Sequence, residues 1–136
     1  MKQADVVVIG GSAAGIPAAI TAKRHYPEKS ILLIRKEKQV LIPCGIPYIF
    51  GTVGTPENNL IPDSVLQANS IELIVDEAVE LNPTEKKVTL ARGESVIYDK
   101  LVLATGSVPL VPPIPGIDKK NIYRKPSRIP AALAAG

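Results

Sequence analysis

The sequence predicts an α/β fold in which a central parallel sheet carries an added antiparallel hairpin or meander. Short, uninterrupted apolar runs recur along the chain, as in strands that are buried on both faces of a sheet. A helical stretch separates the first two of these runs, and alternating apolar and polar runs occur later, on either side of a turn. Hydrophobic residues make up 46% of the 136 residues and aromatic residues only 4%. Val, Ile, Leu and Ala must therefore form the single core that this length allows.

The first predicted unit consists of a strand, a helix and a second strand. Asp5–Ile9 is a continuous apolar run rich in β-branched residues, and Ile31–Ile34 is another apolar run. Between them, apolar residues follow a helical spacing from about Ala13 to Tyr26, and Pro27 ends the stretch. A right-handed crossover makes parallel pairing of the two strands the expected topology.

The middle of the chain is predicted to hold two short helices. Prolines and glycines interrupt residues 41–55, where we expect a short helix between Cys44 and Phe50, flanked by loops. Asp63 is the expected N-cap of a helix that reaches about Asn69.

The rest of the chain returns to strands. The turn signal at residues 82–85 predicts a hairpin, and the prolines beyond Gly106 predict a stiff, extended connection. A weak helix is expected near Ile129. The expected strands are Ile71–Val75, the hairpin of Ala78–Leu81 and Lys87–Leu90, a possible third hairpin strand at Val96–Tyr98, and a buried strand at Leu101–Ala104.

Composition excludes several classes of function. The formal net charge of +3 is small, and the basic residues near the C-terminus indicate a solvated tail. A nucleic-acid site would need a basic face interleaved with aromatic side chains, which the sequence does not contain. One cysteine allows neither an intrachain disulfide nor a cysteine-based metal cluster. Without a signal peptide or an apolar run of about 20 residues, we expect a cytoplasmic protein with no membrane or nucleic-acid partner.

The turn from Gly10 to Gly15 is the first candidate binding element. A strand that leads through a glycine turn into a helix presents backbone N–H groups and the positive end of the helix to an anion, usually a dinucleotide pyrophosphate. Gly10 suits the tight turn, and Gly15 allows the helix to approach the strand closely. The middle glycine of the usual pattern is replaced by Ser12, beside Gly11, so a non-binding glycine turn remains an alternative.

A second departure from the dinucleotide pattern follows the second strand. The acidic residue that normally accepts ribose hydroxyls is replaced by Arg35, which Lys36 follows. In a nicotinamide site this pair would indicate a 2′-phosphate, and in a flavin site it would stack on adenine or contact a phosphate. The alternative is a pair of exposed cations at the end of a strand.

Cys44 is the candidate reactive residue. A single cysteine is commonly a small buried hydrophobic residue. Here, however, it follows Pro43 at the expected start of a helix, where the helix dipole and free N–H groups favour the thiolate. A thiolate is both a nucleophile and a partner for an oxidised flavin.

Three segments together resemble one enzyme family. Ile42–Gly51, with Cys44, Pro47 and Tyr48 in a C-x-x-P-Y core, resembles the active-site segment of coenzyme A-disulfide reductases and related NADH oxidases. Residues 8–15 are similar to the first FAD fingerprint of that family. Residues 101–109 and 112–116 are similar to its second. The resemblance covers about residues 4–117 and identifies the chain as similar to FAD-dependent pyridine nucleotide-disulfide oxidoreductases.

The resemblance implies a role for particular residues. Cys44 would be the redox-active residue beside the flavin. Thr21 and Arg24 match positions near coenzyme A phosphates, although plain helix-surface residues are the alternative. The serine that often precedes the cysteine by four residues is Val40 here, which puts the positioning of the thiol in question. The predicted FAD-binding residues are Gly10, Gly11, Ser12, Ala13, Ala14, Gly15, Arg35, Lys36, Pro43, Val79, Ala104, Thr105 and Gly106.

The resemblance also implies an activity. It predicts a Rossmann-like FAD-binding domain over residues 1–117, and a tail over 118–136 that leads to an absent NAD(P)-binding domain. We therefore expect the N-terminal fragment of a larger, homo-oligomeric flavoprotein, inactive by itself. The complete enzyme would use NAD(P)H to reduce coenzyme A disulfide or a related disulfide through Cys44. The alternatives are an NADH oxidase or peroxidase that forms a sulfenic acid from oxygen or peroxide, and a non-catalytic nucleotide-binding module.

Overall fold

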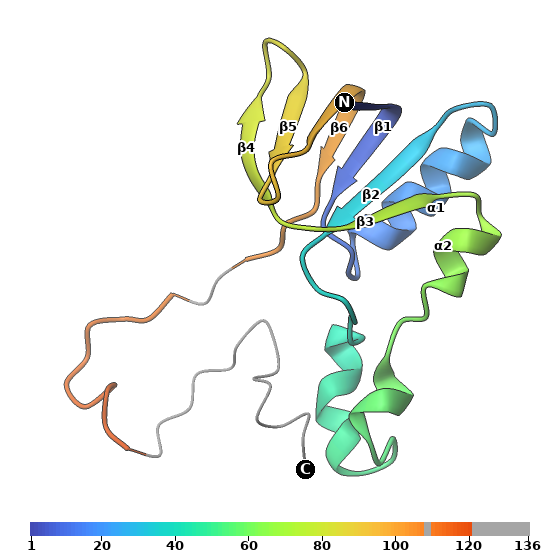
Figure 1. Ribbon diagram of the computed structural model, residues 1–136. Helices are drawn as coiled ribbons and strands as arrows, with labels where there is room; N and C mark the ends of the chain where they lie inside the picture. Colours follow the sequence, from blue (N-terminus) through green and yellow to red (C-terminus); the bar gives the residue numbers. More distant parts are fainter. Residues whose placement is uncertain (108–109, 121–136) are drawn as a thin grey trace. The chain divides into compact units, whose positions relative to one another are not determined.

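The computed structural model describes residues 1–107 and 110–120. The chain divides into two compact units, one of residues 1–105 and one that begins at Gly106. The first unit contains all the helices and strands of the described residues (Figure 1). In the described part of the second unit, turns at residues 115–118 follow an irregular stretch, and the Ile117 N–H donates to the Ile114 carbonyl at 3.3 Å. The helix expected near Ile129 lies outside the described residues.

The first unit is built on a six-stranded sheet with the order β3-β2-β1-β6-β5-β4. Parallel pairing joins β1 (Lys2–Ile9) to β2 (Ile31–Arg35) and to β6 (Ser95–Leu103). It also joins β2 to β3 (Glu72–Val75). This confirms the predicted central parallel sheet, and its four strands end at the same edge.

The antiparallel part of the sheet is the predicted hairpin with a third strand. β4 (Ala78–Asn82) pairs with β5 (Lys87–Leu90), and β5 pairs with the beginning of β6. The expectation of separate strands at 96–98 and 101–104 was wrong, because β6 is continuous. Asp99 and Lys100 interrupt the apolar pattern, yet Lys100 stays in register with Val6 because β1 pairs along most of the length of β6. The end of β6 is not buried as expected, since Leu103 is 61% exposed.

Two hydrophobic clusters cover the two faces of the sheet. On one face, α1 (Gly15–His25) and α2 (Ser64–Ala68) pack against alternate residues of β1 and β2 (Figure 1). Ile16 and Ala19 of α1 meet Leu66 of α2 in this cluster. The other cluster contains side chains from β1, β2, β5 and β6, including the fully buried Val7 and Val88. The alternation of strand side chains between the two clusters is the period-two pattern of a sheet covered on both faces.

Between β2 and α2 the chain forms two short 3-10 helices, η1 (Pro43–Phe50) and η2 (Pro56–Asn59). An isolated antiparallel bridge between Leu41 and Leu60 brings the two ends of this region together. The predicted helix around Cys44 is therefore confirmed, in a 3-10 form that includes Pro47. None of the helices in the described residues is long and apolar enough to span a lipid bilayer.

Candidate functional site

The glycine turn joins β1 to α1 at the carboxyl edge of the parallel strands. Gly10 has a φ of +113°, and a Cβ there would lie 2.1 Å from the Ala104 carbonyl oxygen. A Cβ on Gly15 would lie 1.7 Å from the Gly10 carbonyl oxygen. Since no side chain can occupy these positions without moving the backbone, both glycines are required by packing.

Backbone donors line the turn. Within the described residues, the N–H groups of Ser12, Ala13 and Ala14 have no backbone acceptor, as expected for groups at and before the first turn of a helix. Ala13 and Ala14 are exposed, and Ser12 is half-buried. Three free N–H groups at the positive end of an 11-residue helix suit an anionic group such as a pyrophosphate.

The end of β6 lies against this turn. The Ala104 N–H donates to the Ile9 carbonyl at 2.8 Å, so the chain after β6 runs beside Gly10. The two segments that the sequence marks as fingerprints are thus in contact at Gly10 and Ala104. Thr105 follows and is exposed, whereas Gly106 begins the second unit, whose position relative to the first is not described.

Arg35, the last residue of β2, is buried, and its side chain is only 1% exposed. The alternative of an exposed cation at this position is therefore wrong, and the predicted contact of Arg35 with the cofactor stays a prediction. The guanidinium donates from Nε to the Glu37 carbonyl at 2.8 Å and from Nη2 to the Lys38 carbonyl at 2.7 Å. These bonds fix the loop that follows β2. A Cβ on Gly11 would lie 2.6 Å from Arg35 Cδ, so the arginine side chain also packs against the glycine turn.

The charge partner of Arg35 is Asp63. Arg35 Nη2 donates to Asp63 Oδ2 at 3.0 Å, and Nη1 lies 2.7 Å from Oδ1, outside hydrogen-bonding geometry. Asp63 occupies the N-cap position of α2, as predicted, but makes no side-chain capping bond. Its carboxylate turns to the arginine because an unpaired buried guanidinium would cost far more free energy than a missing cap.

Lys36 and Val79 lie near the neighbouring strand ends. Lys36 is exposed, as expected, and its ammonium group lies 2.5 Å from the Glu77 carboxylate. In the β4–β5 pairing, Ala78 is opposite Leu90 and Glu80 is opposite Thr89. Val79 is therefore the extra residue of a β-bulge, and it is exposed.

Cys44 is the second residue of η1, immediately after Pro43, and its side chain is exposed. The alternative, that this cysteine is a small buried hydrophobic residue, is therefore wrong. η1 lies beyond the carboxyl ends of β1 and β2, on the edge of the sheet that carries the glycine turn (Figure 1). The exposed thiol and the glycine turn thus belong to one compact unit and to one side of the sheet.

Asn59 holds the cysteine segment in place, and sequence reasoning missed it. Its Nδ2 donates to the Ile42 carbonyl at 3.0 Å, while the Ile42 N–H donates to the Asn59 carbonyl at 2.9 Å. A Cβ on Gly45 would lie 1.9 Å from Asn59 Oδ1, so this amide packs against the residue that follows Cys44. Asn59 is buried, but no pattern in the sequence distinguishes it from the exposed Asn58.

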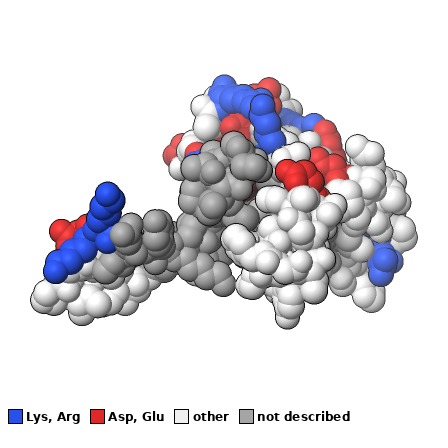
Figure 2. All heavy atoms as spheres, turned by 90° about the horizontal axis from the view of Figure 1, so that it is seen from below, with Lys and Arg blue, Asp and Glu red and all other residues white. Residues whose placement is uncertain are grey.

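The segment of the chain that carries Cys44 has no charged side chains. Residues 39–56 contain no Asp, Glu, Lys or Arg. Areas without Lys, Arg, Asp or Glu face the viewer in the view from below (Figure 2). Within the segment, Tyr48 and Phe50 are exposed, Phe50 by 82%. Thr21 and Arg24 lie on the exposed surface of α1. Their contact with coenzyme A phosphates stays a prediction.

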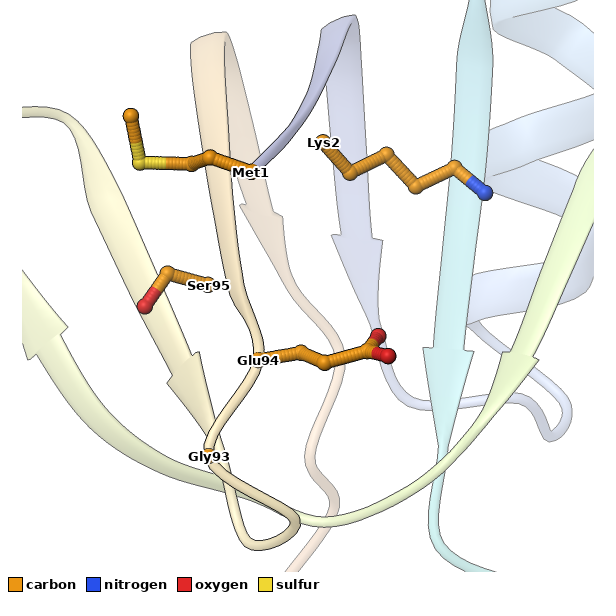
Figure 3. Close-up of a pocket in the computed structure, with 5 residues that line it drawn as sticks. All are labelled: Met1, Lys2, Gly93, Glu94 and Ser95. Carbon is orange, nitrogen blue, oxygen red and sulfur yellow. The ribbon is translucent and has the colours of Figure 1, made fainter.

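A pocket of about 660 Å³ lies elsewhere, between the beginnings of β1 and β6 (Figure 3). Met1, Lys2, Gly93, Glu94 and Ser95 line it. The Lys2 side chain extends away from Met1 and Ser95 (Figure 3). Its ammonium group pairs with Glu72 on β3. The pocket is at the opposite end of the strands from the glycine turn.

Comparison with known proteins gives one consistent family. Residues 4–130 match the family described as pyridine nucleotide-disulphide oxidoreductase. An NAD(P)H coenzyme A polysulfide/persulfide reductase from Pyrococcus horikoshii is 35% identical over 123 residues. This match covers 87% of the chain and 28% of that protein. An NADH oxidase from Enterococcus faecalis is 34% identical over 126 residues, covering 86% of the chain and 28% of the relative.

A solved structure agrees. The NAD-dependent persulfide reductase from A. fulgidus superimposes with a TM-score of 0.75 at 34% sequence identity. The match covers 85% of the chain and 24% of that protein. The chain thus spans less than a third of the length of these relatives.

Proposed function

Because the chain belongs to the pyridine nucleotide-disulphide oxidoreductase family, we propose that it forms the FAD-binding part of an NAD(P)H-dependent enzyme in which Cys44 is the redox residue. Members of this family depend on FAD and NAD(P)H. The proposed domain covers residues 1–117, and residues 118–136 connect it to an NAD(P)-binding domain. The observation that carries the proposal is the contact between the glycine turn and the end of β6, with an exposed cysteine on the same edge of the sheet.

The residues of the glycine turn fit a dinucleotide. The backbone packs closely at Gly10, Gly15 and Ala104, so a side chain on either glycine would clash with a carbonyl oxygen. The free N–H groups of residues 12–14 would hold the pyrophosphate of FAD. Val79 is one of the FAD-binding residues that the resemblance implies, and its bulge would offer backbone groups to the adenine. Thr105 and Gly106 would lie near the flavin half of the cofactor.

Cys44 supplies the nucleophile. Its thiolate attacks one sulfur of a disulfide, forms a new S–S bond to that sulfur, and releases the other sulfur as a thiolate. Bound FAD would supply the two electrons, taken from NAD(P)H, that reduce this mixed disulfide and regenerate the Cys44 thiolate. The second thiolate leaves with a proton from solvent. We propose coenzyme A disulfide, or a related coenzyme A species with an S–S bond, as the substrate, in agreement with the reductases named among the relatives.

A second candidate is an NADH oxidase or peroxidase. Similar proteins from Enterococcus faecalis and Lactococcus lactis carry the name NADH oxidase. Attack of the Cys44 thiolate on a peroxide oxygen gives a sulfenic acid and releases water or an alcohol. The uncharged, exposed surface at residues 39–56 places no barrier between this thiol and a small oxidant.

The test begins with the chain and continues in the complete enzyme. Titration of the chain with FAD should quench flavin fluorescence, with one cofactor bound per chain. In the complete enzyme, Cys44→Ser should keep the flavin but lower NAD(P)H-dependent disulfide reduction at least about 1000-fold, as for the loss of a covalent nucleophile.

The outcomes separate the candidates. Mass spectrometry of the oxidised enzyme should find a coenzyme A adduct on Cys44, whereas a trapped sulfenic acid without an adduct would favour the oxidase. Full turnover by Cys44→Ser would contradict both. Flavin binding without any cysteine-dependent reaction would instead identify a non-catalytic FAD-binding module.

A further inference from the structure

The end of β2 lacks the acid that a dinucleotide fold normally places there. This acid accepts hydroxyl hydrogens of the adenosine ribose. In this chain the position is Arg35, which can donate hydrogen bonds but cannot accept one. The ribose therefore needs another acceptor if the nucleotide binds in the usual place.

Arg35 itself is not available to a nucleotide. Its guanidinium is bound to two backbone carbonyls and to the Asp63 carboxylate, and its side chain is 1% exposed. A 2′-phosphate would have to displace Asp63 and enter a buried site. The interaction with a 2′-phosphate considered from the sequence would require the loss of these bonds.

We propose that Asp63, positioned by Arg35, accepts a ribose hydroxyl of the adenosine part of the cofactor. The Asp63 carboxylate is paired with the guanidinium of Arg35, the residue at the position where the acid is expected. The Arg35 side chain in turn packs against Gly11 of the glycine turn. Its side chain is 43% exposed, and each oxygen retains a further lone pair after pairing with Arg35. The missing N-cap bond is consistent with this role, since the carboxylate is turned toward Arg35 and not toward the amides of α2.

Two other acids near this edge are less suited. Asp76 accepts hydrogen bonds from the backbone N–H groups of Glu77 at 2.8 Å and Arg92 at 3.3 Å. Its oxygens are therefore directed to the residue after it and to the turn between β5 and β6. Glu77 is held by the exposed Lys36, and no buried group fixes either side chain. Asp63 is the acid whose partner is both buried and in contact with the glycine turn.

The test compares nucleotides that differ in one hydroxyl group. The inference rests on the proposed FAD site, and ADP provides the adenosine and pyrophosphate parts of FAD. Calorimetric titration of the chain with ADP, 2′-deoxy-ADP and 3′-deoxy-ADP should reveal a preference of roughly tenfold for ADP over one deoxy analogue, the size of one hydrogen bond to a charged group. Asp63→Ala removes the acceptor, so it should weaken ADP binding by a similar factor and leave that analogue unaffected, and the preference should disappear.

Glu77→Gln is the matched control, because its side chain is 46% exposed and also forms an ion pair. It should keep the preference for ADP. Since Asp63→Ala leaves a buried guanidinium without its counter-charge and can reduce folding, the double variant Arg35→Met, Asp63→Ala removes both charges. It should also bind ADP and the deoxy analogue equally.

Three results would overturn the role of Asp63 while leaving the FAD site intact. The preference for ADP could survive in the Asp63 variants, be absent in the wild type, or be lost in Glu77→Gln. A wild-type chain that binds neither ADP nor FAD would refute the proposed function itself.

Discussion

The glycine turn and the cysteine segment lie at the same edge of the sheet but are held there in different ways. The turn is fixed by backbone against backbone, with the Ala104 carbonyl where a Gly10 side chain would be. The cysteine segment lies on the surface and is held by the Leu41–Leu60 bridge and by the buried amide of Asn59. In the glycine turn, a side chain cannot be added at Gly10 or Gly15 without a clash. The cysteine segment depends instead on a few hydrogen bonds.

This difference has a chemical consequence. A cradle of fixed backbone donors suits a cofactor that stays bound, because its geometry requires no rearrangement. An exposed thiol on a 3-10 helix that few hydrogen bonds hold is accessible to a substrate that arrives from solvent.

The largest effect is expected at Gly10. Gly10→Ala combines a positive φ with a clash against the Ala104 carbonyl, and should lower the free energy of unfolding by about 3 kcal/mol or more. Gly93 is the matched control, because its φ is +88° but nothing lies within 4 Å of a Cβ there. Gly93→Ala should cost about 1 kcal/mol from backbone strain alone. Urea unfolding measures both, and equal losses would mean that the two fingerprint segments are not in close contact.

An intermediate effect is expected at Asn59. Asn59→Ala removes the donor to the Ile42 carbonyl and should lower the free energy of unfolding by about 2 kcal/mol. Hydrogen exchange should show faster exchange of the Gly45 N–H, which donates to the same carbonyl at 3.0 Å. Asn58→Ala removes an exposed bond to the Val53 carbonyl and should cost only a few tenths of a kcal/mol. If both variants behave alike, Asn59 does not anchor the segment.

The smallest effect is expected at Asp5, at the opposite end of β1 from the glycine turn. Hydrogen bonds from the Ser30 hydroxyl and N–H, together with Lys29, hold the pKa of Asp5 well below its usual range. A depressed pKa in the folded state stabilises the protein above the unfolded value of about 4, and this stabilisation is lost as the pH falls below it. Asp5→Asn should therefore lower the urea midpoint slightly at pH 7 and progressively less below pH 4 (about the unfolded pKa). A difference independent of pH would exclude the charge as its cause.

The sequence by itself determined the β-α-β unit, the hairpin and the position of Cys44 at a helix start. These features depend on local patterns: continuous apolar runs, a turn signal, and a proline beside the cysteine. The need for glycine at positions 10 and 15 was also readable, because such turns place backbone where a side chain would be.

Only the tertiary structure decided the continuity of β6 and the state of Arg35. β6 continues through Asp99 and Lys100 because β1 supplies hydrogen bonds along most of it, which a local polarity pattern cannot reveal. Arg35 is buried because Asp63 and the carbonyls of residues 37 and 38 surround its guanidinium. A charge can be buried only when its partners converge on it, and Asp63 is distant in the sequence, so this outcome exists only in the folded chain.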